Sequence, residues 1–304
     1  MGNRATTAHK GNGMIYYFLL AASIILAVCK SAFYNAYAKK SESNLSTTFR
    51  FNTISYGMAV VIALVGALIS KESISAATLL CALFYGIIVL SLQTVSITAM
   101  SVGTMSVTAI CVMSGMILPT MAGPIFWREP IGTMQIPGII LMLLSLWFLR
   151  GERSTDNCKM TKKWVVFALF AFVLSGMAGV MEKIHQSTNG KSERMTFVCT
   201  ACLFMFVFSL IAGRIVRKKR DDGSKSRISP LALLSGIVIG FYSSVNLILA
   251  GKLDSMIYYP IANGGAMILT VVVSSVVFGE RFDKQKTVGV VLGLLGILLL
   301  SLPA

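Results

Sequence analysis

Charged side chains are scarce in this sequence. Only 13% of its 304 residues are Asp, Glu, Lys or Arg and 55% are hydrophobic, whereas a soluble protein carries roughly 25% charged residues. The composition therefore excludes an ordinary soluble enzyme. The net charge of +15 would favour nucleic acid as the partner of a soluble chain. Here the basic residues lie in the breaks between apolar runs, where they contact lipid headgroups, so we expect membrane lipids and no nucleic acid as partners.

Histidine and acidic side chains are also few. The chain has two histidines, His9 and His185, and none of its 12 acidic residues lies in the middle of a long apolar run. Intramembrane catalysis needs convergent His, Asp or Glu side chains, or Ser with Lys or His, so we expect no enzyme. The pair Cys199-x-x-Cys202 lies inside an apolar run without a second pair, which favours packing over a zinc or redox site. We therefore expect neither a metal nor a cofactor.

Long apolar runs dominate what is present. At about 1.5 Å per residue, each run can cross a hydrocarbon core of roughly 30 Å as a helix. The runs are apolar on all faces rather than alternating, which favours helices over a barrel. The ten predicted spans are residues 14–38, 51–70, 77–99, 102–127, 131–149, 164–181, 195–213, 231–251, 255–279 and 287–303. The sequence thus predicts an all-α integral membrane protein with ten transmembrane helices.

One unit of the sequence occurs twice. Glu129 and Gly138 stand nine residues apart at the entry to the fifth span, and Glu280 and Gly289 stand nine residues apart at the entry to the tenth. The two pairs are separated by 151 residues, which is about half of the chain. This offset predicts two homologous halves.

The halves are expected to be inverted relative to each other. The small residues Ser145 and Gly296 keep the offset of 151, and a polar break at 150–163 divides the chain in its middle. Each half holds five predicted helices, an odd number, so the second half enters the membrane in the opposite orientation. We predict two inverted five-helix repeats, residues 1–153 and 154–304, an arrangement shared by many secondary transporters.

With these features the chain resembles the drug/metabolite transporter (DMT) superfamily, and its EamA-like branch in particular. The resemblance rests on ten helices in two repeats, each closing with a Glu, a nine-residue step to a Gly and a Gly- or Ser-rich last helix. It implies a carrier for a small-molecule substrate that works by alternating access, driven by a proton or another gradient, or by exchange. It also implies that the fifth and tenth helices pack outside the central cavity.

Lys30 is the charged residue that lies well inside a predicted span. A lysine at the bilayer centre costs about 2.5–3.5 kcal/mol on insertion scales and usually faces a cavity. Lys30 would then bind an anionic or carboxylate-bearing substrate, with Tyr34 on the same helix face at i+4 spacing. The alternative is that the first helix ends near Cys29 and leaves Lys30 among the headgroups. The small multidrug-resistance branch of the superfamily uses a glutamate in its first helix for cations and protons, so a lysine here favours neutral or anionic cargo.

Two polar patches occupy comparable places in the two halves. Gln93 and Thr94 lie in the third span, and Tyr242 and Asn246 lie in the eighth. Amide side chains in hydrocarbon must hydrogen-bond a neighbouring helix, water or substrate. We predict that the patches line opposite walls of the cavity and bind substrate. Hydrogen bonding between helices is the alternative.

The start of the ninth span carries Tyr258, Tyr259 and Asn263, which we also assign to the substrate site. Tyrosines at the ends of spans are usually interfacial, and these two are equally suited to line or gate a cavity. Glu129 and Glu280, by contrast, lie on loops at opposite sides of the membrane in an inverted repeat, so they cannot form a pair. We predict that each caps the helix that follows it, where the helix dipole favours a negative charge.

These observations together predict a secondary transporter that moves a small polar metabolite, whether anionic, carboxylate-bearing or zwitterionic, across a bacterial-type plasma membrane by alternating access. Two alternatives are a flippase for an anionic lipid-linked sugar and a membrane scaffold or sensor without transport activity. The distribution of basic residues over the loops places both termini outside, whereas members of the resembling family commonly keep their termini in the cytoplasm.

Overall fold

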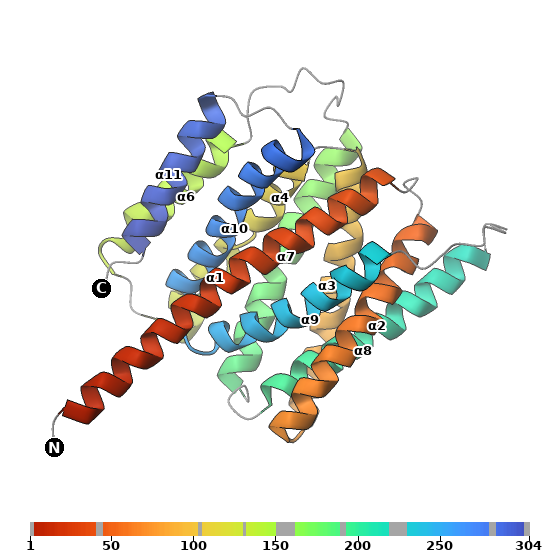
Figure 1. The fold of residues 1–304 in the computed structure, drawn as a ribbon, viewed down its shortest axis with the longest axis horizontal. Helices are drawn as coiled ribbons and strands as arrows, with labels where there is room; N and C mark the ends of the chain where they lie inside the picture. The colour runs from red at the N-terminus through yellow and green to blue at the C-terminus, as the bar shows by residue number, and fades with distance from the viewer. Residues whose placement is uncertain are drawn as a thin grey trace.

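The computed structural model describes residues 3–40, 45–102, 105–129, 132–149, 162–188, 193–218, 230–279 and 284–300. Within these ranges the chain forms helices and no strand (Figure 1). In chain order the helices are α1 (Asn3–Lys40), α2 (Leu45–Ser70), α3 (Ala76–Val102), α4 (Met105–Ser114), α5 (Ile117–Trp127), α6 (Gln135–Leu149), α7 (Lys162–Thr188), α8 (Arg194–Lys218), α9 (Pro230–Ala250), α10 (Ser255–Phe278) and α11 (Lys284–Leu300).

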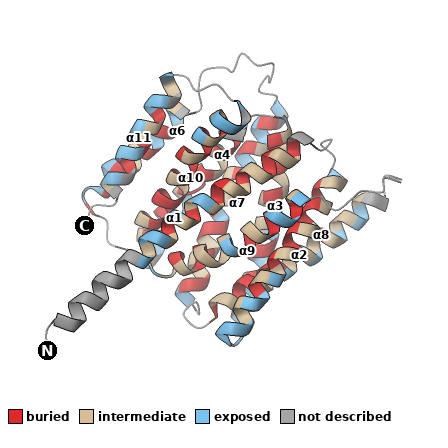
Figure 2. Cartoon of the chain, in the orientation of Figure 1, coloured by how far each residue is buried: buried red, intermediate tan, exposed pale blue. Residues whose placement is uncertain are grey.

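Seven of the described helices, namely α1, α2, α3, α7, α8, α9 and α10, are long and apolar enough to cross a membrane. A helix satisfies its own backbone hydrogen bonds, as a hydrocarbon environment requires. Large apolar side chains face outward: Ile69, Phe126 and Val276 are 78%, 74% and 80% exposed, whereas the buried residues face neighbouring helices (Figure 2). Lipid solvates such a surface and water does not. The chain is therefore a multi-pass integral membrane protein.

The predicted fourth span is two helices, α4 and α5, with a break at Gly115 and Met116. Pro119 explains the break, because proline has no N–H to donate to the carbonyl of Gly115 four residues earlier and its ring clashes with that carbonyl. The break also brings the chain close to α7: a Cβ on Gly115 would lie 2.6 Å from the carbonyl oxygen of Phe172. The fourth span is thus a broken helix rather than the continuous one predicted.

α7 continues beyond the apolar run that predicted it. The run ends at Met181, where the predicted span was also set to end, but the helix extends to Thr188. This extension places Glu182 and His185 inside the helix, and both are buried. The expectation that no acid or histidine lies inside a span is therefore wrong.

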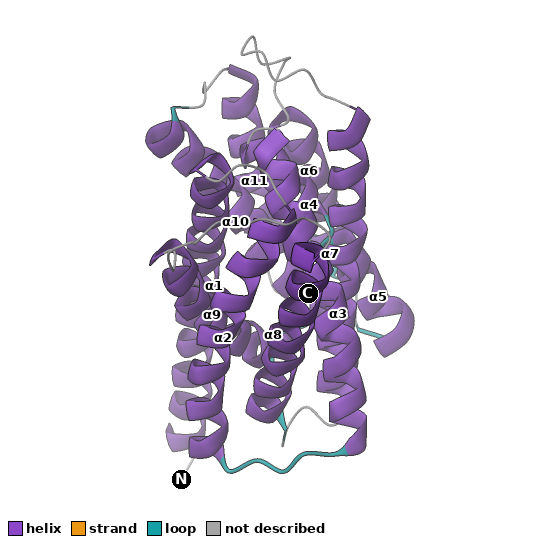
Figure 3. Ribbon diagram, turned by 90° about the vertical axis from the view of Figure 1, so that its right-hand side faces the viewer, coloured by secondary structure: helices purple, strands orange, loops and turns teal. Residues whose placement is uncertain are grey.

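Most helices pack against helices from the other half of the chain. α2 packs against α8 and α9, and α3 packs against α7 and α8. α1 packs against α9 and α10, whereas α4 and α5 pack against α7 and α10. Seen from the side, most of the helices run roughly along one axis (Figure 3). Any site in the middle of this bundle is therefore built by both halves.

α6 and α11 form a pair at the edge of the bundle (Figure 1). The hydroxyl of Ser145 donates a 2.6 Å hydrogen bond to the carbonyl oxygen of Gly289. A Cβ on Gly296 would lie 3.0 Å from the carbonyl oxygen of Gly138. The four small residues that mark the repeat therefore meet in one interface, where small residues let two helices approach closely. The fifth and tenth predicted spans pack at the periphery, as the family resemblance implies.

Candidate functional site

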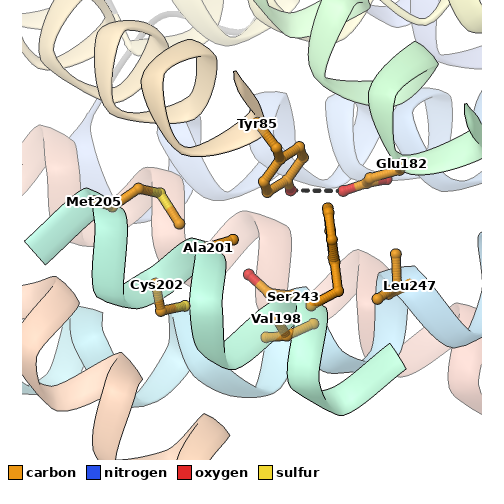
Figure 4. Close-up of a pocket in the computed structure, with 9 residues that line it drawn as sticks. Tyr85, Glu182, Val198, Ala201, Cys202, Met205, Ser243 and Leu247 are labelled. Atoms are coloured by element: carbon orange, nitrogen blue, oxygen red, sulfur yellow. Dashed lines mark hydrogen bonds between the residues drawn. The ribbon is translucent and has the colours of Figure 1, made fainter. Parts of the chain in front are cut away.

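Glu182 lines a pocket between α3, α7, α8 and α9. The hydroxyl of Tyr85, on α3, donates a 2.7 Å hydrogen bond to Oε1 of Glu182, on α7 (Figure 4). Glu182 is only 8% exposed. The other lining residues are Phe197, Val198, Ala201, Cys202, Met205, Ser243 and Leu247. The pocket is therefore assembled from one helix of the first half and three of the second.

The wall that α8 contributes to this pocket is apolar. Phe197 belongs to this wall. The centroid of its ring lies 5.4 Å from that of Tyr85, and the ring stacks on that of His185 with 4.0 Å between centroids. The polar groups of the pocket are the carboxyl of Glu182 and the hydroxyls of Tyr85 and Ser243. A buried carboxylate is costly unless it is paired or hydrogen-bonded. The pocket can therefore hold a cationic or proton-donating group next to Glu182.

Lys30 approaches the same region from α1. This helix runs without interruption to Lys40, so the alternative that it ends near Cys29 is wrong. The ammonium nitrogen of Lys30 lies 4.0 Å from the centroid of the Tyr242 ring on α9. This geometry is a cation–π contact, which holds the charge of the lysine over the face of the ring.

Two opposite charges are therefore close to each other without forming an ion pair. Lys30 and Glu182 interact electrostatically, yet in the described part of the chain the ion pair with atoms within 4.0 Å is that of Lys183 with Glu129. The sequence indicated Lys30 as the charged residue inside a span, whereas the structure places the carboxyl group of Glu182 in the same region. The cavity region carries one amine and one carboxyl group.

A spacing in the sequence could have identified Glu182. Ala171, Ala178, Glu182 and His185 are all buried, and they follow one another at steps of seven, four and three residues, which places them on one helix face. The span was predicted to end at the first charged residue. A helix face that is turned to the protein interior can carry polar groups that a lipid-facing surface cannot.

The predicted patch of the third span joins α2 to α3. The hydroxyl of Tyr56 donates to Oε1 of Gln93, and Nε2 of Gln93 donates a 2.9 Å hydrogen bond to Oδ1 of Asn52. The amide of Asn52 donates in turn to Oγ1 of Thr94 at 3.0 Å. These bonds connect two helices of the same half, which is the arrangement weighed as the alternative to substrate binding.

The other residues predicted on α1 and α9 have separate surroundings. Tyr242 makes the cation–π contact described above, whereas Oδ1 of Asn246 accepts a 2.5 Å hydrogen bond from the hydroxyl of Ser23 on α1. Tyr34 is buried and packs edge-to-face on Phe51 of α2, with 6.1 Å between ring centroids. Tyr242 thus lies beside the charged groups, while Asn246 and Tyr34 hold α1 against its neighbours.

The tyrosine pair at the start of α10 is buried. Tyr258 and Tyr259 are 2% and 3% exposed, and their ring centroids lie 4.7 Å apart. The hydroxyl of Tyr259 donates a 2.7 Å hydrogen bond to the carbonyl oxygen of Gly179 on α7, and the amide of Asn263 donates to the carbonyl oxygen of Tyr259 at 3.1 Å. This burial excludes an interfacial role for the tyrosines.

Comparison with known proteins relates the second half of the chain to a family. Residues 162–302, which begin with α7, match the model of the EamA-like transporter family. The chain carries an EamA-like transporter domain. No curated protein matches the chain. A solved structure, described only as a crystal structure of a protein, superimposes with a TM-score of 0.67 over 95% of this chain and 96% of its own, at 11% identity. At that identity the likeness shows the fold alone, but it extends over both halves.

The EamA-like domain supplies most of the pocket but not all of it. Glu182 and the walls from α8 and α9 lie within the matched residues. Tyr85 and Lys30 come from the half that precedes the domain. The resemblance to the EamA-like branch of the DMT superfamily is thereby confirmed, and the charged groups belong to both parts of the chain.

A second group of carboxylates lies at one end of the bundle. Glu129 accepts a 2.7 Å hydrogen bond from the backbone N–H of Ser255, the first residue of α10, and pairs with Lys183 at 2.6 Å. A negative charge at a helix N-terminus is stabilised by the helix dipole. Glu129 therefore caps α10 of the EamA-like domain, and the prediction that it caps the helix following it is wrong. Glu280 lies outside the described residues.

Glu72 and Glu193 cap helices of opposite halves at the same end. Glu72 accepts a 2.6 Å hydrogen bond from the backbone N–H of Met195 at the start of α8. Glu193 accepts a 3.1 Å hydrogen bond from the backbone N–H of Ser75, just before α3. It also accepts hydrogen bonds from the hydroxyls of Thr78 and Ser75. These hydrogen bonds, that of Thr78 first, hold the pKa of Glu193 below its ordinary value of 4.5.

Proposed function

We propose that this membrane transporter is a secondary carrier of a small polar metabolite, working by alternating access between two inverted five-helix halves, residues 1–153 and 154–304. The cargo is anionic, carboxylate-bearing or zwitterionic, and a proton is the candidate coupling ion. One observation carries the proposal: Lys30 and Glu182, from different halves, bring opposite charges into one buried region without pairing. Charged groups inside a membrane are costly and mark substrate or ion pathways.

The pattern of helix contacts supports the inverted halves. Exchanging α1 with α7, α2 with α8, α3 with α9, α4–α5 with α10 and α6 with α11 converts the α1–α9 contact into α7–α3 and the α2–α9 contact into α8–α3. It also converts the α1–α10 contact into the contacts of α7 with α4 and with α5. All of these contacts occur in the structure. The pairs α2–α8 and α6–α11 map onto themselves, as pairs on a two-fold axis must. With α4–α5 counted as one crossing, each half has five crossings. Because five is odd, the second half would enter the membrane in the opposite orientation to the first.

The location of the pocket supports a carrier. Substrate sites of inverted-repeat carriers lie at the interface between the repeats. Tyr85 of the first half and Glu182 of the second meet in the pocket, and Lys30 and Tyr242 bring the two halves together beside it. The amine of Lys30 attracts the negatively charged part of a cargo, and the aromatic rings of Tyr85 on α3 and Phe197 on α8 line the pocket for its apolar part.

The contacts at the end of the bundle support alternating access. This mechanism requires that one end of the carrier is closed while the other admits cargo. Glu72, Glu129 and Glu193 each join loops or helix starts from both halves at the same end. The cargo would therefore reach the pocket from the opposite end. Opening the pocket at the end where Glu129 lies would require separation of Glu129 from Lys183 and from Ser255.

A binding screen followed by transport in vesicles tests the proposal. A metabolite that binds the folded state raises the melting temperature of the purified protein in proportion to its occupancy. We expect such a compound among small acids and amino acids, and we expect it to exchange across the membrane of vesicles that contain the protein. Lys30→Ala should abolish this exchange, whereas Lys71→Ala, an exposed loop lysine, should retain it. Binding without protein-dependent exchange, or full exchange by Lys30→Ala, would contradict the proposal.

A further inference from the structure

We propose that Glu182 and Tyr85 form a subsite for a cationic group, and that this subsite together with Lys30 over Tyr242 selects a zwitterionic cargo that carries both an ammonium and a carboxylate group. This inference rests on the proposed transport function and specifies its substrate class. It adds to the pocket a carboxyl group that the sequence did not assign to substrate binding.

The surroundings of Glu182 leave it able to bind a cation. The group that hydrogen-bonds it is the hydroxyl of Tyr85, at 2.7 Å. A carboxylate has about four acceptor positions on its two oxygens, so one donor leaves most of them open. No Lys or Arg of the described chain lies within 4.0 Å of Glu182, whereas Glu129 at the end of the bundle has such a partner. A buried carboxylate without a cation is unfavourable, and an ammonium group from the cargo would remove that penalty.

The surroundings of Lys30 keep it from acting as the cation that pairs with Glu182. Its ammonium nitrogen lies 4.0 Å from the centroid of the Tyr242 ring. A cation–π contact holds the charge over the ring but leaves those of the three lysine N–H donors that do not face the ring available to a carboxylate. Lys30 and Glu182 still interact electrostatically, so the two charges lie near enough to act on one small molecule.

Two opposite charges from different helices discriminate among charge types. A purely anionic cargo would meet Lys30 favourably but be repelled by Glu182, and a purely cationic cargo would meet the reverse. A zwitterion compensates both charges at once, which is how a site rejects partners that carry only one of them. The apolar wall from α8, including Val198, Ala201 and Cys202, lines the pocket next to Glu182 and would face the uncharged part of such a molecule (Figure 4).

Matched triplets of small molecules test the inference directly. Each triplet contains a zwitterion, the acid that lacks its amino group and the amine that lacks its carboxylate. The triplets are alanine, propionate and ethylamine; leucine, isocaproate and isopentylamine; phenylalanine, hydrocinnamate and phenethylamine; and γ-aminobutyrate, butyrate and propylamine. The melting temperature of the purified full chain is measured against rising concentrations of each compound. We expect at least one zwitterion to stabilise the protein at a concentration at which its acid and its amine do not.

Two variants assign the selectivity to the charges. Glu182→Gln keeps the size and the acceptor for Tyr85 but removes the negative charge, so it should weaken zwitterion binding by about tenfold or more and improve binding of the matched acid. Lys30→Met should weaken zwitterion binding and improve binding of the matched amine. Asp254→Asn is the matched control, because Asp254 is exposed and its side chain caps no helix N–H; it should leave the order of affinities unchanged.

Each contrary outcome separates this inference from the proposed function. Preferential stabilisation by an acid or an amine overturns the zwitterion inference, but such a compound that exchanges across vesicles upholds the carrier. Zwitterion binding that Glu182→Gln leaves unchanged, or no stabilisation by any of the four zwitterions, also overturns the inference. Exchange of compounds from the wider screen then decides the transport function independently.

Discussion

Two groups of buried carboxylates in this protein differ in how far they are satisfied. At the end of the bundle, Glu129 has a lysine and a helix N-terminus as partners, and Glu193 accepts hydrogen bonds from two residues. In the pocket, Glu182 accepts a hydrogen bond from Tyr85 and has no cation within 4.0 Å among the described residues. Satisfied carboxylates hold helices together. The carboxylate with unused capacity marks the place where a ligand can bind.

The largest effect is expected from the satisfied group. Lys183→Met leaves Glu129 buried without its cation, and removing one partner of a buried ion pair costs roughly 3–5 kcal/mol. We expect a clear fall in melting temperature, measured on the purified protein. If the pair acts as a unit, Lys183→Met combined with Glu129→Gln should be less destabilised than the sum of the two single variants. Equal stability of Lys183→Met and the wild type would remove the distinction between the two groups of carboxylates.

The next effect concerns activity rather than stability. Lys30→Met removes the charge beside the pocket, so we expect exchange of the cargo in vesicles to fall by about tenfold or more, which corresponds to about 1.4 kcal/mol or more. The melting temperature should change little, because Lys30 makes its described contact with the face of Tyr242 and not with a carboxylate. A variant that is destabilised yet transports normally would assign Lys30 to structure.

A smaller effect is expected for the network between α2 and α3. Gln93→Met removes its hydrogen bonds with Tyr56 and Asn52. The net contribution of a hydrogen bond is about 0.5–1.5 kcal/mol, so we expect the protein to be destabilised by about 1 kcal/mol or somewhat more. The concentration of cargo at half-maximal exchange should stay the same. A large rise in that concentration without a loss of stability would instead support the prediction that Gln93 contacts the substrate.

The smallest effect is a dependence of stability on pH. The pKa of Glu193 lies below its ordinary value of 4.5 in the folded protein, so the folded state binds fewer protons there than the unfolded state. The stabilisation is complete above pH 4.5 and is lost as the pH falls below 4.5 through the folded pKa. The melting temperature should therefore decrease in this acidic range. Glu193→Gln should make the decrease shallower, and an identical pH profile for the variant would contradict the assignment.

The sequence predicted those features that depend on composition and regular spacing. The offset of 151 residues between Gly138 and Gly289 corresponds to a real interface between α6 and α11, because close helix packing selects small residues. Lys30 was placed correctly inside a helix because its apolar surroundings extend on both sides. Such local signals are readable without knowledge of which helices are neighbours.

Features that depend on contacts between distant residues were missed. Glu182 was read as the end of a span, because hydropathy cannot show that its helix face is turned inward. Glu129 was assigned to the helix that follows it, because nothing in the sequence indicates that Ser255 lies beside it. The break in the fourth span needed Gly115 and Pro119 to be read together. Each error concerns a polar or helix-breaking residue whose role is determined by another part of the chain.

The crossed capping by Glu72 and Glu193 has a consequence for how the protein is made. The start of α3 depends on a carboxylate that follows it by more than a hundred residues, and the start of α8 depends on one from the opposite half. During synthesis, the backbone N–H of Ser75 therefore cannot meet Glu193 until the loop before α8 has emerged. The two helix starts can therefore be capped in this crossed way only after the two halves have docked.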